Sequence, residues 1–104
     1  MQPSAKQVWF LVVPRTSMIN IAGPWEVFGH ANDLLGREAY VLHAFGPSAP
    51  AAQTRFGLCL GNLRPLPPRF DNPPDTVVVA GGSPADPMPE DHAPLIPWLR
   101  QHRP

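Results

Sequence analysis

Two nearly uninterrupted apolar runs, QVWFLVV at 7–13 and TVVVAGG at 76–82, constrain the fold of this chain more than any other feature. Such runs, rich in valine and aromatic residues, are typical of β-strands that are buried on both faces. Strands of this kind belong to parallel sheets whose faces are covered by helices. Pro14 ends the first run because proline cannot donate to the strand ladder, and Gly81-Gly82 ends the second.

The period of the sequence becomes helical between residues 21 and 36. We expect a helix here, with Pro24 in its first turn and Gly36 at its C-terminal end. A further strand is expected at 39–46, so that residues 14–38 form the crossover of a βαβ unit. The apolar stripe that should face the core, at helical spacing, consists of Val27, Phe28, Ala31, Leu34 and Leu35.

The remainder of the chain carries weaker signals. Residues 52–63 contain β-type side chains around Gly57 and predict a short hairpin or a bulged strand. A proline-stiffened loop follows at 64–75, and a final helix is expected around 93–102, provided that Pro97 lies in its first turn. A sheet with so few buried strands leaves its edges open. We therefore expect an α/β fold that is incomplete in this chain, or that another chain completes.

Charge and hydropathy exclude two classes of function. Eight basic and eight acidic side chains cancel, and no run of one sign occurs. Direct nucleic-acid binding by this segment is not expected, since it needs clustered Lys and Arg. The apolar run near the start is too short to span a bilayer and has no small-residue cleavage site after it, which predicts a cytoplasmic protein with no membrane contact.

A family resemblance is carried by FLVVPRTSMINIAGPWEVFGHANDL at 10–34 and by RFGLCL and DTVVVAGG at 55–60 and 75–82. These segments resemble the class I glutamine amidotransferase-like (ThiJ/PfpI superfamily) domain found at the N-terminus of AraC-type transcriptional regulators. The resemblance implies a flavodoxin-like, three-layer α/β/α sandwich with a mostly parallel sheet. Residues 1–104 would be the N-terminal part of this domain, without a helix-turn-helix domain.

Two departures from the enzymes of this superfamily argue against catalysis. Those enzymes use a cysteine on a strand-to-helix turn, which would follow the segment equivalent to 93–102 and is absent here. Asn20 occupies the position where the isonitrile hydratase-like branch carries a catalytic Asp, and an amide cannot transfer a proton near neutral pH. We therefore assign no catalytic residue and expect a non-catalytic, ligand-sensing segment. The alternative is a fragment of a ThiJ/PfpI enzyme, a hydratase or hydrolase, whose cysteine lies beyond residue 104.

The ligand-binding site is expected at the carboxyl ends of the buried strands, where open α/β sheets form their crevice. The candidate ligand-binding residues there are Arg15, Asn20, Glu26, Gly81 and Gly82. Each has a simpler alternative. Asn20 would serve as a helix N-cap, and Glu26 would form a weak surface pair with His30 in preference to a metal site with His30 and Asp33. The two glycines would form a tight turn in place of an oxyanion hole.

The remaining expectations concern packing and partners. Cys59 lies between two leucines and is expected to be a buried, inert thiol. The tryptophans at 9, 25 and 98 are expected mainly in core or dimer packing, although Trp25 is also placed to line a ligand cleft. No cofactor or metal is implied. The expected partners are a small-molecule effector and a second copy of the chain, with helix 21–36 and the Pro-rich loops offering the most apolar surface.

Overall fold

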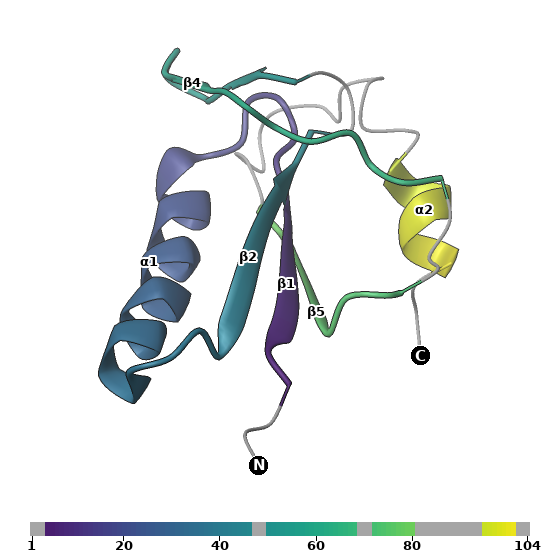
Figure 1. Cartoon of the computed structure of the whole chain (residues 1–104). Coiled ribbons are helices and arrows are strands. Elements are labelled where there is room, and N and C mark those ends of the chain that lie inside the picture. Colours follow the sequence, from purple (N-terminus) through teal and green to yellow (C-terminus); the bar gives the residue numbers. More distant parts are fainter. Residues whose placement is uncertain (1–3, 47–49, 69–71, 81–94, 102–104) are drawn as a thin grey trace.

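A computed structural model describes residues 4–46, 50–68, 72–80 and 95–101 of the chain. It contains a three-stranded parallel sheet with a helix on each face, so the predicted α/β fold is confirmed (Figure 1). No helix in these segments is long and apolar enough to cross a membrane. In chain order the elements are β1 (Lys6–Leu11), α1 (Met18–Leu35), β2 (Tyr40–Phe45), β3 (Ala52–Gln53), β4 (Cys59–Leu60), β5 (Thr76–Val79) and α2 (Leu95–Gln101).

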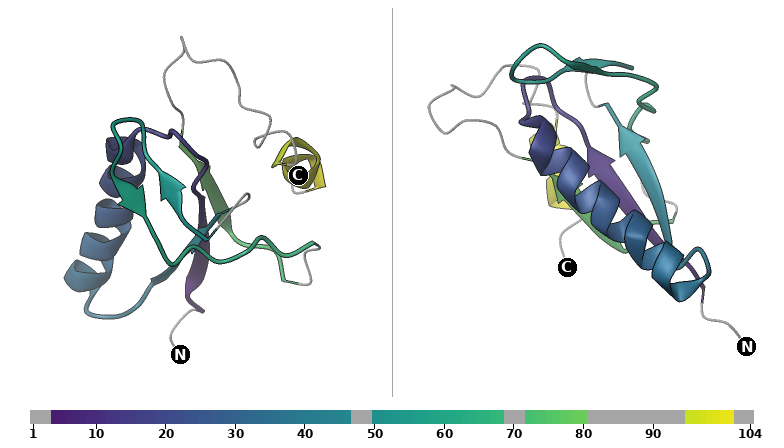
Figure 2. Two further views of the ribbon diagram at one scale, coloured as in Figure 1. Left: turned by 90° about the horizontal axis from the view of Figure 1, so that it is seen from above. Right: turned by 90° about the vertical axis from the view of Figure 1, so that its left-hand side faces the viewer.

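Strand β1 is the centre of the sheet, between β2 and β5, in the order β2-β1-β5. Because successive side chains of a strand point to opposite faces, β1 and the two residues after it supply both sides of the core. Val8, Phe10 and Val12 belong to the cluster that packs against α1. Leu11 and Val13 belong to the cluster that packs against α2. The two helices lie on opposite sides of the sheet (Figures 1 and 2), which explains why this run has almost no polar position.

Helix α1 packs on the sheet through Ile21, Trp25 and Phe28, spaced four and three residues apart. The ring of Phe10 lies 5.0 Å from that of Trp25 and 6.3 Å from that of Phe28, measured between centroids. The predicted stripe is therefore only partly right. Phe28 contacts the core, but the other large members of the stripe, Val27, Leu34 and Leu35, are exposed. The predicted stripe is centred about a quarter-turn away from the face that the sheet contacts.

The ends of α1 confirm one prediction and correct two. Gly36 ends the helix in the left-handed conformation, with φ of 68°, as expected. The helix begins at Met18 with Ser17 at the N-cap, so the prediction that Asn20 caps it is wrong. Pro24 is inside the helix and outside its first turn, because the helix starts three residues earlier than predicted. Lacking an N–H, Pro24 cannot donate to the carbonyl oxygen of Asn20.

Helix α2 covers the other face of the sheet through the buried side chains of Leu95 and Trp98. The Trp98 ring stacks 6.0 Å from that of Trp9, and Trp9 lies 4.5 Å from Phe45. The indole Nε1–H of Trp98 donates to the carbonyl oxygen of Pro67 at 2.9 Å, which satisfies its polar group. Pro97 is the third residue of α2 and thus lies in its first turn, as the prediction required.

Strands β3 and β4 form the predicted hairpin, with Gly57 at φ of 97° in its turn. Two backbone bonds fix it over the β1–α1 loop: Arg15 N–H donates to Gln53 O at 2.8 Å, and Arg55 N–H donates to Thr16 O at 3.0 Å. The prediction for Cys59 is wrong, because its side chain is exposed. A two-stranded ribbon lying on the rest of the chain keeps one face in solvent.

Asn32, on the packed face of α1, holds the start of β2 through three hydrogen bonds. Its amide Oδ1 accepts from the N–H groups of Ala39 and Tyr40, both at 2.9 Å, and its Nδ2 donates to Tyr40 O at 2.9 Å. The side chain thus completes the backbone hydrogen bonding where the crossover turns into the strand.

We expect Asn32→Ala to lower the free energy of unfolding by about 2–3 kcal/mol, at about 1 kcal/mol for each lost hydrogen bond. Urea denaturation measures the change. Asp33→Ala is the matched control, since Asp33 is exposed on the same helix, next to Asn32, and the substitution raises helix propensity by a similar amount. Equal stability of the two variants would contradict the anchoring role of Asn32.

Candidate functional site

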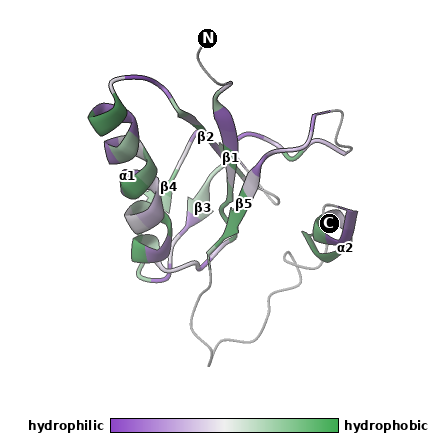
Figure 3. Ribbon diagram, turned by 90° about the horizontal axis from the view of Figure 1, so that it is seen from below, coloured by the Kyte–Doolittle hydropathy of each residue, from purple (hydrophilic) through white to green (hydrophobic). Residues whose placement is uncertain are grey.

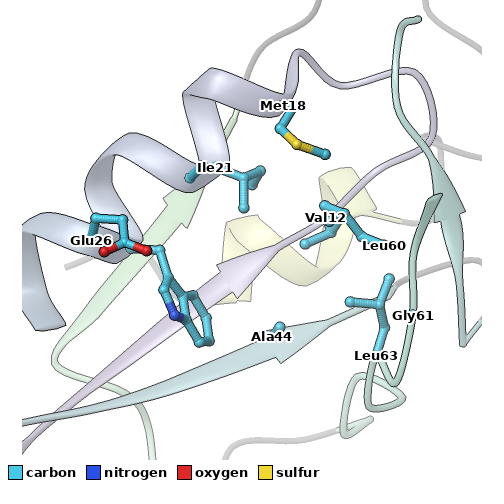
Figure 4. A pocket seen from close by; sticks show the side chains of 10 residues that line it. Val12, Met18, Ile21, Glu26, Ala44, Leu60, Gly61 and Leu63 are labelled. Carbon is cyan, nitrogen blue, oxygen red and sulfur yellow. The ribbon is translucent and has the colours of Figure 1, made fainter. Parts of the chain in front are cut away.

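A cavity of about 270 Å³ lies between the N-terminal half of α1, the ends of β1 and β2, and the segment that follows the hairpin (Figure 4). In Figure 4, Met18 and Ile21 reach into it from the helix, opposite Leu60 and Leu63. The full lining consists of Val12, Met18, Ile21, Ala22, Trp25, Glu26, Ala44, Leu60, Gly61 and Leu63.

The walls of the cavity are positioned by the packing of β1 against α1 and by a backbone hydrogen bond after the hairpin. Val12 and Ile21 belong to the buried cluster between β1 and α1, which fixes two of the walls. The far wall is brought in by the hairpin, and the N–H of Leu63 donates to Pro50 O at 2.9 Å. All three parallel strands end at this edge of the sheet, so the cavity lies at the carboxyl ends where the ligand site was expected.

Among the described residues, the lining of the cavity is apolar apart from one carboxylate. That carboxylate belongs to Glu26, and His30 lies one turn further along α1. The carboxylate Oε2 of Glu26 is 3.5 Å from Nε2 of His30, and both side chains are largely exposed. Such a site suits a compact apolar molecule that presents a cation or a hydrogen-bond donor to Glu26, with the indole of Trp25 as a flat wall.

The predicted site residues divide into separate places. Glu26 lines the cavity, whereas Arg15 and Asn20 are exposed and do not line it. Gly81 and Gly82 lie outside the described residues. For all five, the predicted ligand contact stays a prediction.

Arg15 belongs to a second feature at the same edge of the sheet. There the loop after β1 meets the end of β5, and the buried hydroxyl of Thr16 donates to Ala80 O at 3.2 Å. The chain adds β2 on one side of β1 and later adds β5 on the other side, so the strand order switches direction at this contact. We call the contact between Thr16 and Ala80 the reversal point. The sequence-based site therefore merged two neighbouring places, the reversal point and the cavity beside α1.

Most of the cavity wall was not singled out from the sequence. Met18 and Ala22 stand on the helix just before Glu26, and their spacing of four residues was the available signal. Leu60, Gly61 and Leu63 come from a segment 34 to 45 residues later in the chain than these residues of α1. Nothing local in those three residues indicates that they meet α1.

The described residues offer no catalytic or metal-binding set at the cavity. Cys59, the single cysteine of the chain, lies next to Leu60 but does not line the cavity. Within the segments that the structure describes, no three His, Cys, Asp or Glu side chains are grouped to hold a metal ion. Glu26 and His30 form the simple helical pair that was the alternative to a metal site.

A separate polar network surrounds His43 on β2. Its Nδ1 lies 2.7 Å from a guanidinium nitrogen of Arg64, and its Nε2 lies 2.7 Å from Oε1 of Gln7. Because a guanidinium can only donate, Nδ1 accepts and Nε2–H donates, which is the neutral form of the ring. Burial lowers the pKa of His43 below its ordinary 6.5, the charge of Arg64 lowers it further, and Glu38 opposes the shift.

We expect the protein to lose stability as the pH falls below 6.5, the ordinary pKa of His43. Below that pH the unfolded chain takes up a proton that the folded His43 binds less tightly, so unfolding becomes easier until the folded pKa is passed. Above pH 6.5 the full contribution of neutral His43 to the free energy of unfolding is present.

Urea titrations of wild type and His43→Gln between pH 5 and 8 measure this dependence, and the difference between them isolates His43. His30→Gln is the control, since His30 lies on the exposed side of α1, and it should retain the His43 dependence. An identical pH profile for wild type and His43→Gln would contradict the assignment.

No protein-family model and no curated protein matches this sequence. Two solved structures share the fold. An AraC family transcriptional regulator from Pseudomonas putida superimposes with a TM-score of 0.72 at 20% identity, over 93% of this chain and 59% of that one. A proposed transcriptional regulator from Vibrio parahaemolyticus gives 0.67 at 15% identity, over 94% of this chain and 51% of that one. The chain thus corresponds to somewhat more than half of each regulator.

Proposed function

We propose that this chain is the N-terminal part of an amidotransferase-like (ThiJ/PfpI) ligand-sensing domain of an AraC-type transcriptional regulator. In this role it binds a small effector without converting it, and DNA binding belongs to another part of the regulator. The observation that carries the proposal is the preformed apolar cavity at the carboxyl ends of the strands, in a fold shared with more than half of an AraC family regulator.

The character of the cavity favours binding over catalysis. A hydrolase or hydratase of this superfamily needs a nucleophile and a proton carrier close together. Position 20 holds an amide, which cannot carry the proton. This amide supports sensing over the alternative of an enzyme fragment whose cysteine lies beyond residue 104.

The effector that the cavity suits best is compact and mostly apolar, with one cationic group. A volume of about 270 Å³ is just below the usual range for drug-sized ligands, so a ligand of fragment size is expected. The carboxylate of Glu26 at the rim favours an amine over a carboxylate. The amine would replace or join His30 as the partner of Glu26.

A matched set of probes tests this proposal: 2-phenylethylamine, 2-phenylethanol and 3-phenylpropionate, which share an apolar body and differ in charge. We expect the amine to bind most tightly and the carboxylate least tightly, as measured by isothermal titration calorimetry. Glu26→Gln should weaken amine binding by up to about fivefold, because an exposed ion pair contributes about 1 kcal/mol or less.

Two further variants separate the cavity from non-specific binding. Ala22→Leu places a larger side chain in the cavity wall and should abolish binding of all three probes, because it fills space that the ligand needs. Ala51→Leu makes the same change at an exposed position outside the lining and should leave binding unchanged. If the Ala22→Leu variant still binds the probes, the proposal that this cavity is the effector site is contradicted.

A further inference from the structure

The outward side of α1 carries a mostly apolar strip that is largely exposed in the described structure. Three large apolar side chains on it are largely exposed: Ile19 at 74%, Val27 at 67% and Leu34 at 89%. With Gly23 and His30 between them, they stand at spacings of four, four, three and four residues. We call Ile19, Gly23, Val27, His30 and Leu34 the outer strip.

The outer strip lies on the opposite side of the helix from the residues that pack on the sheet. At 100° per residue, its members fall within a sector of about 80°, and Ile21, Trp25, Phe28 and Asn32 fall on the far side. A methyl group added to Gly23 would meet no atom within 4 Å, so the strip is open at this point. Hydrophobic residues recur along the whole length of α1 (Figure 3).

The residues of the outer strip can pack against the same strip of a second copy that runs in the opposite direction. When a second α1 lies antiparallel across it, centred between positions 26 and 27, residue i faces residue 53 − i of the other copy. Ile19 then faces Leu34, and Gly23 faces the imidazole of His30, a gap facing a large ring. A two-fold interface requires this kind of self-complementarity, in which each contact occurs twice.

Charge favours the same arrangement. Glu26 borders the strip, and in the antiparallel pairing it lies beside His30 of the second copy, one helical turn from the axis. In a parallel pairing Glu26 would face Glu26 and His30 would face His30, while the two glycines would leave a gap between the helices. Antiparallel helices also set opposite ends of their dipoles side by side.

We propose that the outer strip of α1 is the contact surface for a second copy of this chain, packed antiparallel across a two-fold axis at Glu26 and Val27. The contact is one helix wide, and interfaces below about 1,200 Å² in total are typical of weak complexes. The dimer therefore forms reversibly and depends on concentration. The five residues of the outer strip do not line the cavity, but Glu26 borders the strip and also lines the cavity, so the two surfaces meet at this carboxylate.

Disulfide cross-linking tests the orientation. The background is Cys59→Ser, which removes the exposed native thiol. Val27→Cys lies beside the axis, where the two copies of residue 27 come together, and should form a covalent dimer under mild oxidation. Leu34→Cys is the matched control and should stay monomeric, because its two copies lie about 22 Å apart along the helix axis, well beyond the roughly 7 Å that a disulfide allows.

Efficient cross-linking of Leu34→Cys would overturn the antiparallel arrangement and indicate parallel helices. Failure of Val27→Cys to cross-link at concentrations where the wild type is dimeric would place the interface elsewhere.

Sedimentation velocity across a concentration series tests the surface itself. Wild type should shift from monomer to dimer as concentration rises, and Val27→Glu should remain monomeric with an unchanged circular dichroism spectrum. Leu58→Glu is the control, because Leu58 is exposed on the hairpin outside the strip, and it should dimerise like wild type. A wild type that stays monomeric, a dimeric Val27→Glu or a monomeric Leu58→Glu would each contradict the proposal.

Discussion

The packing of β1 between two helices is the constraint on which the rest of this structure depends. Phe10 faces α1 and Leu11 faces α2, and neither side chain has any surface accessible to solvent. Full burial of such a side chain contributes about 1.5–3 kcal/mol. The backbone of β1 also pairs with both β2 and β5. Both helices and both neighbouring strands therefore contact β1.

The cavity follows from this arrangement. Val12 continues the α1-facing row of β1 beyond the strand and becomes its floor, while α1 forms one wall. The opposite wall comes from the hairpin, which has little core of its own and is held by backbone bonds to the loop at Arg15 and Thr16. The same loop contacts Ala80 at the end of β5. A ligand beside α1 would therefore contact segments that are linked to the opposite edge of the sheet.

The apolar runs at 7–13 and 76–79 were sufficient to predict two of the strands. Burial on both faces explains the first run, but the same prediction was wrong for the second, because Thr76 and Val79 of β5 are exposed and the two valines between them are half-buried. The sequence predicted the existence of α1 but not its packed face. Leu34 and Leu35 continue the apolar pattern although they point to solvent, and Asn32, which is polar, faces the sheet. Apolar residues that serve a second surface cannot be distinguished by periodicity from those that serve the core.

The site was predicted only in part for a related reason. Glu26 could be identified because it lies in the N-terminal half of the helix that follows the first buried strand. The wall formed by Leu60 to Leu63 could not, because it reaches α1 through tertiary contacts between distant segments.

The central claim is that ligands bind in the cavity beside α1 and not at the reversal point between β1 and β5. Amide ¹H–¹⁵N chemical-shift mapping with 2-phenylethylamine tests it most directly. The account predicts saturable shifts in residues 18–26 and 60–63, with little change at Thr16 and Ala80. Shifts concentrated at Thr16 and Ala80, with the residues of the cavity unaffected, would contradict it.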